Sequence, residues 1–260
     1  LRIGRPRPQA ILVRPDNPLI VQSDQTVLVE VDSPRYGEAR DALARFAELV
    51  KSPEHVHTYR VTPLSVWNAC AAGLTADEIV ATLDEYAKYP VPAAVGVQLR
   101  DAAGRYGRLR LERDAEGLVL VALDLPLAEE VARTRHVAPL LGERVAPLAF
   151  RVDPMLRGRL KQALVRGGFP PEDLAGYTEG EPLPTALRPV ARSGAGFALR
   201  DYQRDAVAAF HAAGSARGGS GVVVLPCGAG KTVVGMACMA ELQTSTLILT
   251  TSVTAVRQWI

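Results

Sequence analysis

The chain has 260 residues, of which 48% are hydrophobic and 22% are charged, and its formal net charge is +2. These values are typical of a globular protein that can bury a core, and the length allows one or two domains. No apolar run approaches the roughly 20 residues of a membrane-spanning helix, so we expect no membrane partner. The net charge falls short of the strongly basic balance of a dedicated nucleic-acid-binding module.

The N-terminal residues and the cysteines bear on location. Residues 1–17 are rich in arginine and proline and predict a flexible basic arm that touches nucleic-acid phosphates; an extension of no consequence is the alternative. No apolar segment follows the first arginines, so we expect no signal peptide. Cys70, Cys227 and Cys238 are odd in number and far apart, which argues against a disulfide framework and favours a cytoplasmic location.

Residues 18–122 predict an N-terminal domain that mixes strands and helices. Hydrophobic periodicity and turn residues predict strands at 19–22, 26–31 and 56–61, and helices at 36–49, from 63, at 75–86 and up to about 106. Thr62 is placed to cap the helix that begins at Pro63, and Thr75 with Glu78 matches a capping box.

A hairpin is expected at the end of this domain, from strands at 108–112 and 117–122. Three short helices followed by a two-stranded hairpin predict a winged-helix-like part. Arg108 and Arg110 on this wing are candidate contacts to DNA phosphates, although an alternating strand must expose something polar and arginine serves that purpose too.

Residues 123–181 predict a second, small α+β unit without evident catalytic chemistry. We expect helices at 127–135 and 154–166, a strand at 145–152 and a capped turn at 170–177. Residues 182–196 are rich in proline and glycine and predict a linker.

Residues 197–260 contain the most informative motif, Leu225-Pro-Cys-Gly-Ala-Gly-Lys-Thr232. It lies between an apolar run at 221–225, which predicts a buried strand, and a predicted helix at 233–242. A strand, a glycine-rich turn and a helix that begins at Lys-Thr form a phosphate-binding loop, although Leu225 stands where the full pattern has its first glycine.

The chemistry of such a loop needs these residue types. Gly228 and Gly230 allow successive amides to face one anion, to which the helix N-terminus adds partial positive charge. Lys231 can reach the β- and γ-phosphates, and the Thr232 hydroxyl can bind Mg²⁺. We therefore expect Lys231 and Thr232 to be catalytic, Thr232 to be the metal ligand, and the loop to bind nucleotide through Cys227, Gly228, Ala229, Gly230, Lys231, Thr232 and Val233.

Gln203 lies 28 residues before Lys231 in the run Leu199-Arg-Asp-Tyr-Gln203. A glutamine amide both donates and accepts hydrogen bonds, so it can distinguish adenine from guanine. We expect Gln203 to read the adenine of ATP and Arg200 to hold the base or its surroundings. Taken alone, a glutamine on a solvated helix face is the simpler interpretation.

Together these motifs resemble superfamily 2 helicases, and most closely the bacterial branch of the XPB-type DNA helicases. The resemblance extends over almost the whole chain from Pro18 onward. The segments that carry it are 18–24, 55–68, 105–109, 172–177 and 224–231.

The resemblance implies an α/β fold with α+β N-terminal units, a damage-recognition-like domain at 123–181 and the beginning of a RecA-like P-loop domain at 197–260. It implies ATP and Mg²⁺ as cofactors and ATP-driven, 3′-to-5′ translocation on DNA in repair. After an expected strand at 246–251, it implies DNA-backbone contacts by Arg257, Gln258 and Trp259.

The partners that the resemblance implies are single-stranded and forked duplex DNA of any sequence, with a repair nuclease as a further candidate. The acidic motif that positions magnesium and water, and the second motor lobe, are not among the 260 residues. We therefore expect the chain to bind nucleotide without hydrolysing it. Two alternatives stay open at this point: a different P-loop enzyme such as a small-molecule kinase, and a non-catalytic DNA- or protein-binding module with a structural loop.

Overall fold

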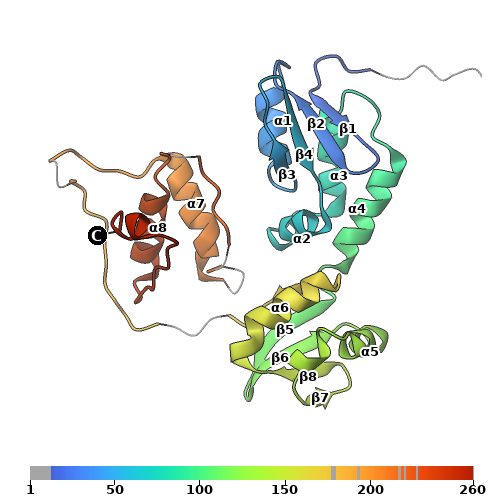
Figure 1. Ribbon diagram of the computed structural model, residues 1–260, viewed down its shortest axis with the longest axis vertical. Coiled ribbons are helices and arrows are strands. Elements are labelled where there is room, and N and C mark those ends of the chain that lie inside the picture. Colours follow the sequence, from blue (N-terminus) through green and yellow to red (C-terminus); the bar gives the residue numbers. More distant parts are fainter. Residues whose placement is uncertain are drawn as a thin grey trace, which may run out of the picture. The chain divides into compact units, whose positions relative to one another are not determined.

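The computed structural model describes residues 13–176, 180–191, 194–215, 218–219, 221–226 and 228–259. They form a mixed α/β fold with two sheets, and the chain divides into two compact units between Glu172 and Asp173 (Figure 1). Within the described residues, none of the helices combines the length and apolarity that crossing a bilayer needs.

The first unit begins with a four-stranded antiparallel sheet in the order β1-β2-β4-β3. Its strands are β1 (Leu19–Val21), β2 (Thr26–Glu30), β3 (Glu48–Lys51) and β4 (Val56–Arg60). Alternate residues of β2 face the core, where Val27 and Val29 are fully buried, as the period of a half-buried strand requires. The three strands expected in this region are confirmed, while β3 was not expected.

The predicted helix at 36–49 is wrong in its second half. Helix α1 (Tyr36–Leu43) ends early, and Leu49 lies in β3, paired with Tyr59 of β4. The helical spacing of apolar residues continues to Phe46, which is buried, but the chain reaches that position through a turn. The open edge of β4 then provides backbone hydrogen bonds that a local periodicity does not reveal.

Three further helices follow the first sheet in the chain: α2 (Pro63–Ala71), α3 (Ala76–Tyr86) and α4 (Ala93–Arg105). Both predicted caps are present, because Thr62 accepts from the backbone of Ser65 and Thr75 accepts from that of Glu78. Trp67 is buried, and its indole N–H donates to the carbonyl of Ala102 in α4. The helices and the sheet bury one core, whose largest fully buried side chains are Leu19, Leu43, Phe46, Ile79, Leu83 and Leu99.

The expected hairpin is formed by β5 (Leu109–Asp114) and β6 (Gly117–Ala122), but its use as a wing is not confirmed. It belongs to a five-stranded sheet in the order β7-β8-β6-β5-β9, with β7 (Arg144–Ala146), β8 (Ala149–Val152) and β9 (Pro171–Asp173). Strand β6 is apolar and mostly buried, and it pairs with β5 on one side and with β8 on the other, whereas a wing is a hairpin that projects into solvent.

The remaining elements of this unit are α5 (Leu125–Arg133), α6 (Arg157–Arg166) and two short 3₁₀ helices, η1 (Ala138–Leu140) and η2 (Pro154–Leu156). The two predicted helices are confirmed. The predicted strand at 145–152 is two strands, β7 and β8, which pair with each other across a turn. This architecture does not confirm a damage-recognition-like domain, which stays a prediction.

The second unit contains α7 (Asp201–His211), η3 (Ala212–Gly214), α8 (Lys231–Leu242) and α9 (Val253–Val256). Helices α7 and α8 pack together around Val207, Val234 and Ala237.

The strands expected at 221–225 and 246–251 are wrong, because both segments are irregular and exposed. Val222 is 89% exposed and Leu249 is 84% exposed. An apolar strand of a parallel sheet depends on paired neighbours and on covering helices. Neither segment has a paired strand among the described residues, so a RecA-like sheet is not formed there.

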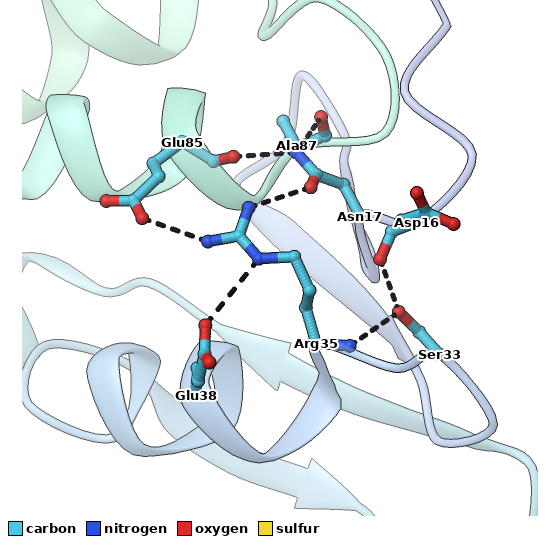
Figure 2. A network of polar contacts seen from close by, with 7 residues as sticks. All are labelled: Asp16, Asn17, Ser33, Arg35, Glu38, Glu85 and Ala87. Carbon is cyan, nitrogen blue, oxygen red and sulfur yellow. Dashed lines mark hydrogen bonds and ion pairs between the residues drawn. The ribbon is translucent and has the colours of Figure 1, made fainter.

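A buried asparagine joins three elements of the first unit (Figure 2). Asn17 precedes β1 and is only 5% exposed. Its amide nitrogen donates to the carbonyls of Glu85 (2.6 Å) and Ala87 (3.0 Å) at the end of α3. Its amide oxygen accepts from the guanidinium of Arg35 (3.0 Å), which precedes α1 and also pairs with the carboxylate of Glu85.

Replacement of this asparagine should destabilise the chain. Asn17→Ala leaves two backbone carbonyls and one guanidinium N–H without their partner, which costs about 1–3 kcal/mol of unfolding free energy. Urea unfolding followed by circular dichroism measures the loss. Asn68→Ala, which removes the same side chain from an exposed position of α2, is the matched control. Equal stability of the two variants would contradict the structural role of Asn17.

Candidate nucleotide-binding site

The glycine-rich loop ends at the N-terminus of α8. Gly228 has φ of 78° and Gly230 has φ of 81°, both in the left-handed region that favours glycine. Gly230 is the N-cap of α8 and provides no side chain to the first amides of the helix, which therefore stay suited to an anion. Cys227 was also expected to bind nucleotide, but it lies outside the described residues.

Lys231 is the first residue of α8 and is exposed. Its ammonium group donates to the carbonyls of Leu225 (2.8 Å) and Pro226 (3.0 Å). These two bonds hold the positive charge over the loop, where an incoming phosphate can exchange with the carbonyl oxygens. Thr232, the candidate magnesium ligand, follows in the first turn of α8 and is half-buried.

The structure brings Gln203 against the loop, although 28 residues separate it from Lys231. Gln203 lies in the first turn of α7 and is 5% exposed. Its amide oxygen accepts from the backbone N–H of Arg200 (3.0 Å), and its amide nitrogen donates to the carbonyl of Ala229 (3.0 Å). One amide hydrogen and one oxygen lone pair remain, which are the groups that an adenine edge needs.

Tyr202 makes a contact that the sequence did not predict. Its hydroxyl donates to the same carbonyl of Ala229, at 2.8 Å, so two neighbouring side chains of α7 hold one loop carbonyl. The only sequence signal for this role is the phenol directly before Gln203.

Two cavities lie beside the loop, both within the second unit. One, of about 290 Å³, is lined by six of the predicted residues, together with Phe197 as an apolar wall. These six are Arg200, Gln203, Gly228, Ala229, Gly230 and Val233. The other, of about 440 Å³, is lined by Tyr202, Leu225 and Pro226 among others. The smaller cavity thus combines the polar side chains of Arg200 and Gln203 with loop backbone and a few apolar side chains, a combination that can orient a small molecule.

The residues predicted to contact DNA lie in different environments. Arg257 and Gln258 follow α9 and are exposed, whereas the Trp259 indole is half-buried against Gly235 of α8. The Arg108 guanidinium donates to the carboxylate of Asp124 (3.1 Å). The Nη1 of Arg110 lies 3.5 Å from the Oε1 of Glu112. The N–H of Leu127, and then Arg108, lower the pKa of Asp124, which is the N-cap of α5.

Metal ligands other than Thr232 are not evident in the described part of the chain. There, no group of three or more histidines, cysteines and carboxylates could hold an ion. His55 lies 3.3 Å from Asp32, and the Nδ1 of His57 lies 3.0 Å from the hydroxyl of Tyr36, so each of these histidines has a protein partner.

The contacts of Gln203 predict a loss of stability in the absence of any ligand. Gln203→Ala leaves the N–H of Arg200 unpaired and removes one of two donors to Ala229, which costs about 1–3 kcal/mol. Urea unfolding without nucleotide measures this loss. Gln162→Ala on the exposed face of α6 is the control. If both variants were as stable as the parent chain, Gln203 would not hold the loop.

Two family models match the chain. Residues 19–146 match a helicase conserved C-terminal domain, and residues 196–260 match the res subunit of type III restriction enzymes.

Relatives match over almost the whole chain. The chain is 54% identical to a DNA 3′-5′ helicase XPB from Kineococcus radiotolerans, over 94% of the chain and 42% of that protein. The corresponding protein of Mycobacterium tuberculosis is 53% identical, over 94% of the chain and 43% of that protein. In Enterocytozoon bieneusi, the XPB helicase/translocase subunit of general transcription and DNA repair factor IIH is 28% identical. The chain thus spans about two fifths of these relatives, and over almost its whole length it is homologous to bacterial DNA 3′-5′ helicases XPB.

Proposed function

We propose that the chain is part of an ATP-dependent DNA helicase or translocase of the XPB type, which moves with 3′-to-5′ polarity and acts in DNA repair. The observation that carries the proposal is the convergence of Gln203 on the phosphate loop through the carbonyl of Ala229 (3.0 Å). Besides holding the loop, the amide keeps one N–H and one lone pair for the edge of a base, which a loop that binds phosphate alone would not use. The two bacterial relatives, which are DNA 3′-5′ helicases, support the same activity.

In this proposal the loop binds ATP with Mg²⁺. Lys231 leaves the carbonyls of Leu225 and Pro226 and neutralises the β- and γ-phosphates, while the Thr232 hydroxyl takes a place in the magnesium shell. The first amides of α8 and the left-handed glycines face the phosphate oxygens. Gln203 uses its remaining N–H and lone pair for adenine, and Arg200 lies at the same cavity.

The 260-residue chain should bind nucleotide without hydrolysing it. Hydrolysis needs an acidic group that positions the metal and the attacking water. Glu241 is the only acidic residue between Val233 and Ile260, and it lies 10 residues after Lys231, about 15 Å along α8. Its carboxylate is 3.7 Å from His211, at the opposite end of the helix from the loop.

Nucleotide selectivity tests the proposal. Titration with Mg-ATP and Mg-GTP should show preference for ATP, and Gln203→Ala should weaken ATP more than GTP by roughly 5- to 150-fold, because one polar group of the base loses its partner. Lys231→Ala should abolish the thermal shift that Mg-ATP produces. Lys51→Ala, which removes an exposed lysine of β3, should retain it.

The outcomes separate the alternatives. If Gln203→Ala lost the same affinity for both nucleotides, the role of Gln203 would be purely structural. The remaining interpretation would then be a P-loop enzyme of another kind, such as a small-molecule kinase. If neither nucleotide shifted the melting temperature, the loop would be structural and the chain a binding module.

We further propose that DNA is bound through its backbone, regardless of sequence, as single strands and forked duplexes. Arg257, Gln258 and Trp259 are the proposed contacts of the second unit, and Arg108 and Arg110 those of the first. A translocase must release and rebind at each step, and phosphate contacts permit this because they carry no sequence information. A repair nuclease as partner, and the cytoplasm as location, remain predictions.

Salt dependence tests the contacts of the first unit. If Arg108 and Arg110 both bind phosphates, replacing both with alanine should reduce the slope of log affinity against log salt concentration by about two. Fluorescence anisotropy of a labelled forked duplex measures the slope. The double variant of the exposed Arg45 and Lys51 loses the same charge and is the control. A slope equal to that of the control would assign Arg108 and Arg110 to their carboxylate partners alone.

A further inference from the structure

Gly235 of α8 provides the place where the Trp259 indole rests. A Cβ atom built on Gly235 would lie 2.5 Å from Cη2 of Trp259 and 3.3 Å from its Cζ3. Real Cβ atoms do not approach other atoms so closely, so any side chain at position 235 forces the indole away. The absence of a side chain at 235 is therefore what allows the contact.

This contact lies close to the phosphate loop. Gly235 follows Lys231 by four residues and Thr232 by three, which places all three on one side of α8. The rise of a helix puts Gly235 about 6 Å along the axis from Lys231. The indole thus rests one helical turn from the group that is proposed to bind phosphate.

Residues 252–259, which include Trp259, bury little of their surface. All eight are described, and six of them are exposed, with only Ala255 and Trp259 half-buried. Val253 and Val256 of α9 are 70% and 43% exposed, so α9 itself adds little packing. Arg257 and Gln258 directly precede Trp259, and therefore their positions depend on the position of its ring.

We propose that Gly235 is a positioning residue that couples the phosphate loop to the segment Arg257–Trp259, because its lack of a side chain allows the Trp259 indole to pack against α8. A helix moves as a rigid element, so a displacement of its N-terminus by bound nucleotide is transmitted to a ring that rests one turn further on. The ring then shifts Arg257 and Gln258, and nucleotide controls the affinity for the DNA backbone. This inference rests on the proposed function, since it takes the loop to bind nucleotide and the segment to bind DNA.

The contact between Gly235 and the Trp259 indole is tested without nucleotide. Trp259 and Trp67 are the two tryptophans of the chain. In a Trp67→Phe background, Gly235→Ala should make Trp259 more accessible to acrylamide quenching. Gly158→Ala in α6 is the matched control, because a Cβ at this helical glycine meets no atom within 4 Å. If Trp67→Phe does not fold, quenching of the two-tryptophan chain gives the same information, because Trp67 is only 7% exposed.

The coupling is tested with Mg-ADP and a labelled single-stranded oligonucleotide. In the parent chain, saturating Mg-ADP should change the affinity for the oligonucleotide by a factor of about 5–150, and the oligonucleotide should change the affinity for Mg-ADP by the same factor. Gly235→Ala should bring this factor close to one while Mg-ADP still binds. Gly158→Ala should leave the factor unchanged.

A compensating variant separates coupling from general damage. Adding Trp259→Phe to Gly235→Ala replaces the indole with a shorter ring that fits beside the new methyl group, and should recover part of the coupling factor. The inference fails if Gly235→Ala quenches like Gly158→Ala, or if it keeps the full coupling factor. If Mg-ADP does not bind even the parent chain, the proposed function fails, and the quenching comparison still decides whether Gly235 seats the ring.

Discussion

The carbonyl group of Ala229 is the point on which the candidate site depends. It accepts from the Tyr202 hydroxyl (2.8 Å) and from the Gln203 amide (3.0 Å), so both lone pairs of one loop oxygen are used by α7. Gly228 and Gly230, on either side of it, both have left-handed backbone conformations, and the carbonyl between them faces the side chains of α7. Consequently the amides, and not the carbonyls, of the loop remain for an anion.

The same carbonyl links recognition of a base to the shape of the loop. Gln203 cannot rotate toward a ligand without releasing either Ala229 or the N–H of Arg200, which it caps at the start of α7. A base that uses the remaining amide hydrogen and lone pair leaves both bonds intact, and adenine fits this condition. In the proposed nucleotide site, Gln203 holds the loop and faces the base at once, because its amide nitrogen and its amide oxygen each use one hydrogen-bonding position for the protein and keep one for the ligand.

Local signals were the part of the sequence that predicted structure well. The capping residues Thr62 and Thr75 fix where α2 and α3 begin, because a hydroxyl at the N-cap satisfies an amide that no other group reaches. The glycine-rich loop could be predicted for the same reason, because the left-handed backbone conformation at positions 228 and 230 favours glycine. The pairing of two motifs predicted that Gln203 lies close to the nucleotide site, but not that its amide holds the carbonyl of Ala229.

Sequence reasoning failed wherever the outcome depends on distant partners. The residues of β3 continue a helical periodicity, yet they form a strand because β4 presents an open edge. The hairpin of β5 and β6 was recognised, but its place in a five-stranded sheet depends on β8, which follows it by almost thirty residues. The runs at 221–225 and 246–251 have the composition of strands, and they remain exposed because strand propensity alone cannot replace neighbouring strands.

The surroundings of a charged residue are likewise not evident from the sequence. The sequence predicted the same role, a contact to the DNA backbone, for Arg108 and Arg257. In the structure, Arg108 donates to the carboxylate of Asp124, which caps α5, whereas Arg257 is exposed and lies two residues before the half-buried Trp259. An arginine that binds a phosphate must first leave its carboxylate, and a surface ion pair opposes this by at most about 1 kcal/mol. The pairing therefore weakens Arg108 as a proposed phosphate ligand without removing it, and among the proposed DNA contacts it favours the segment around Arg257.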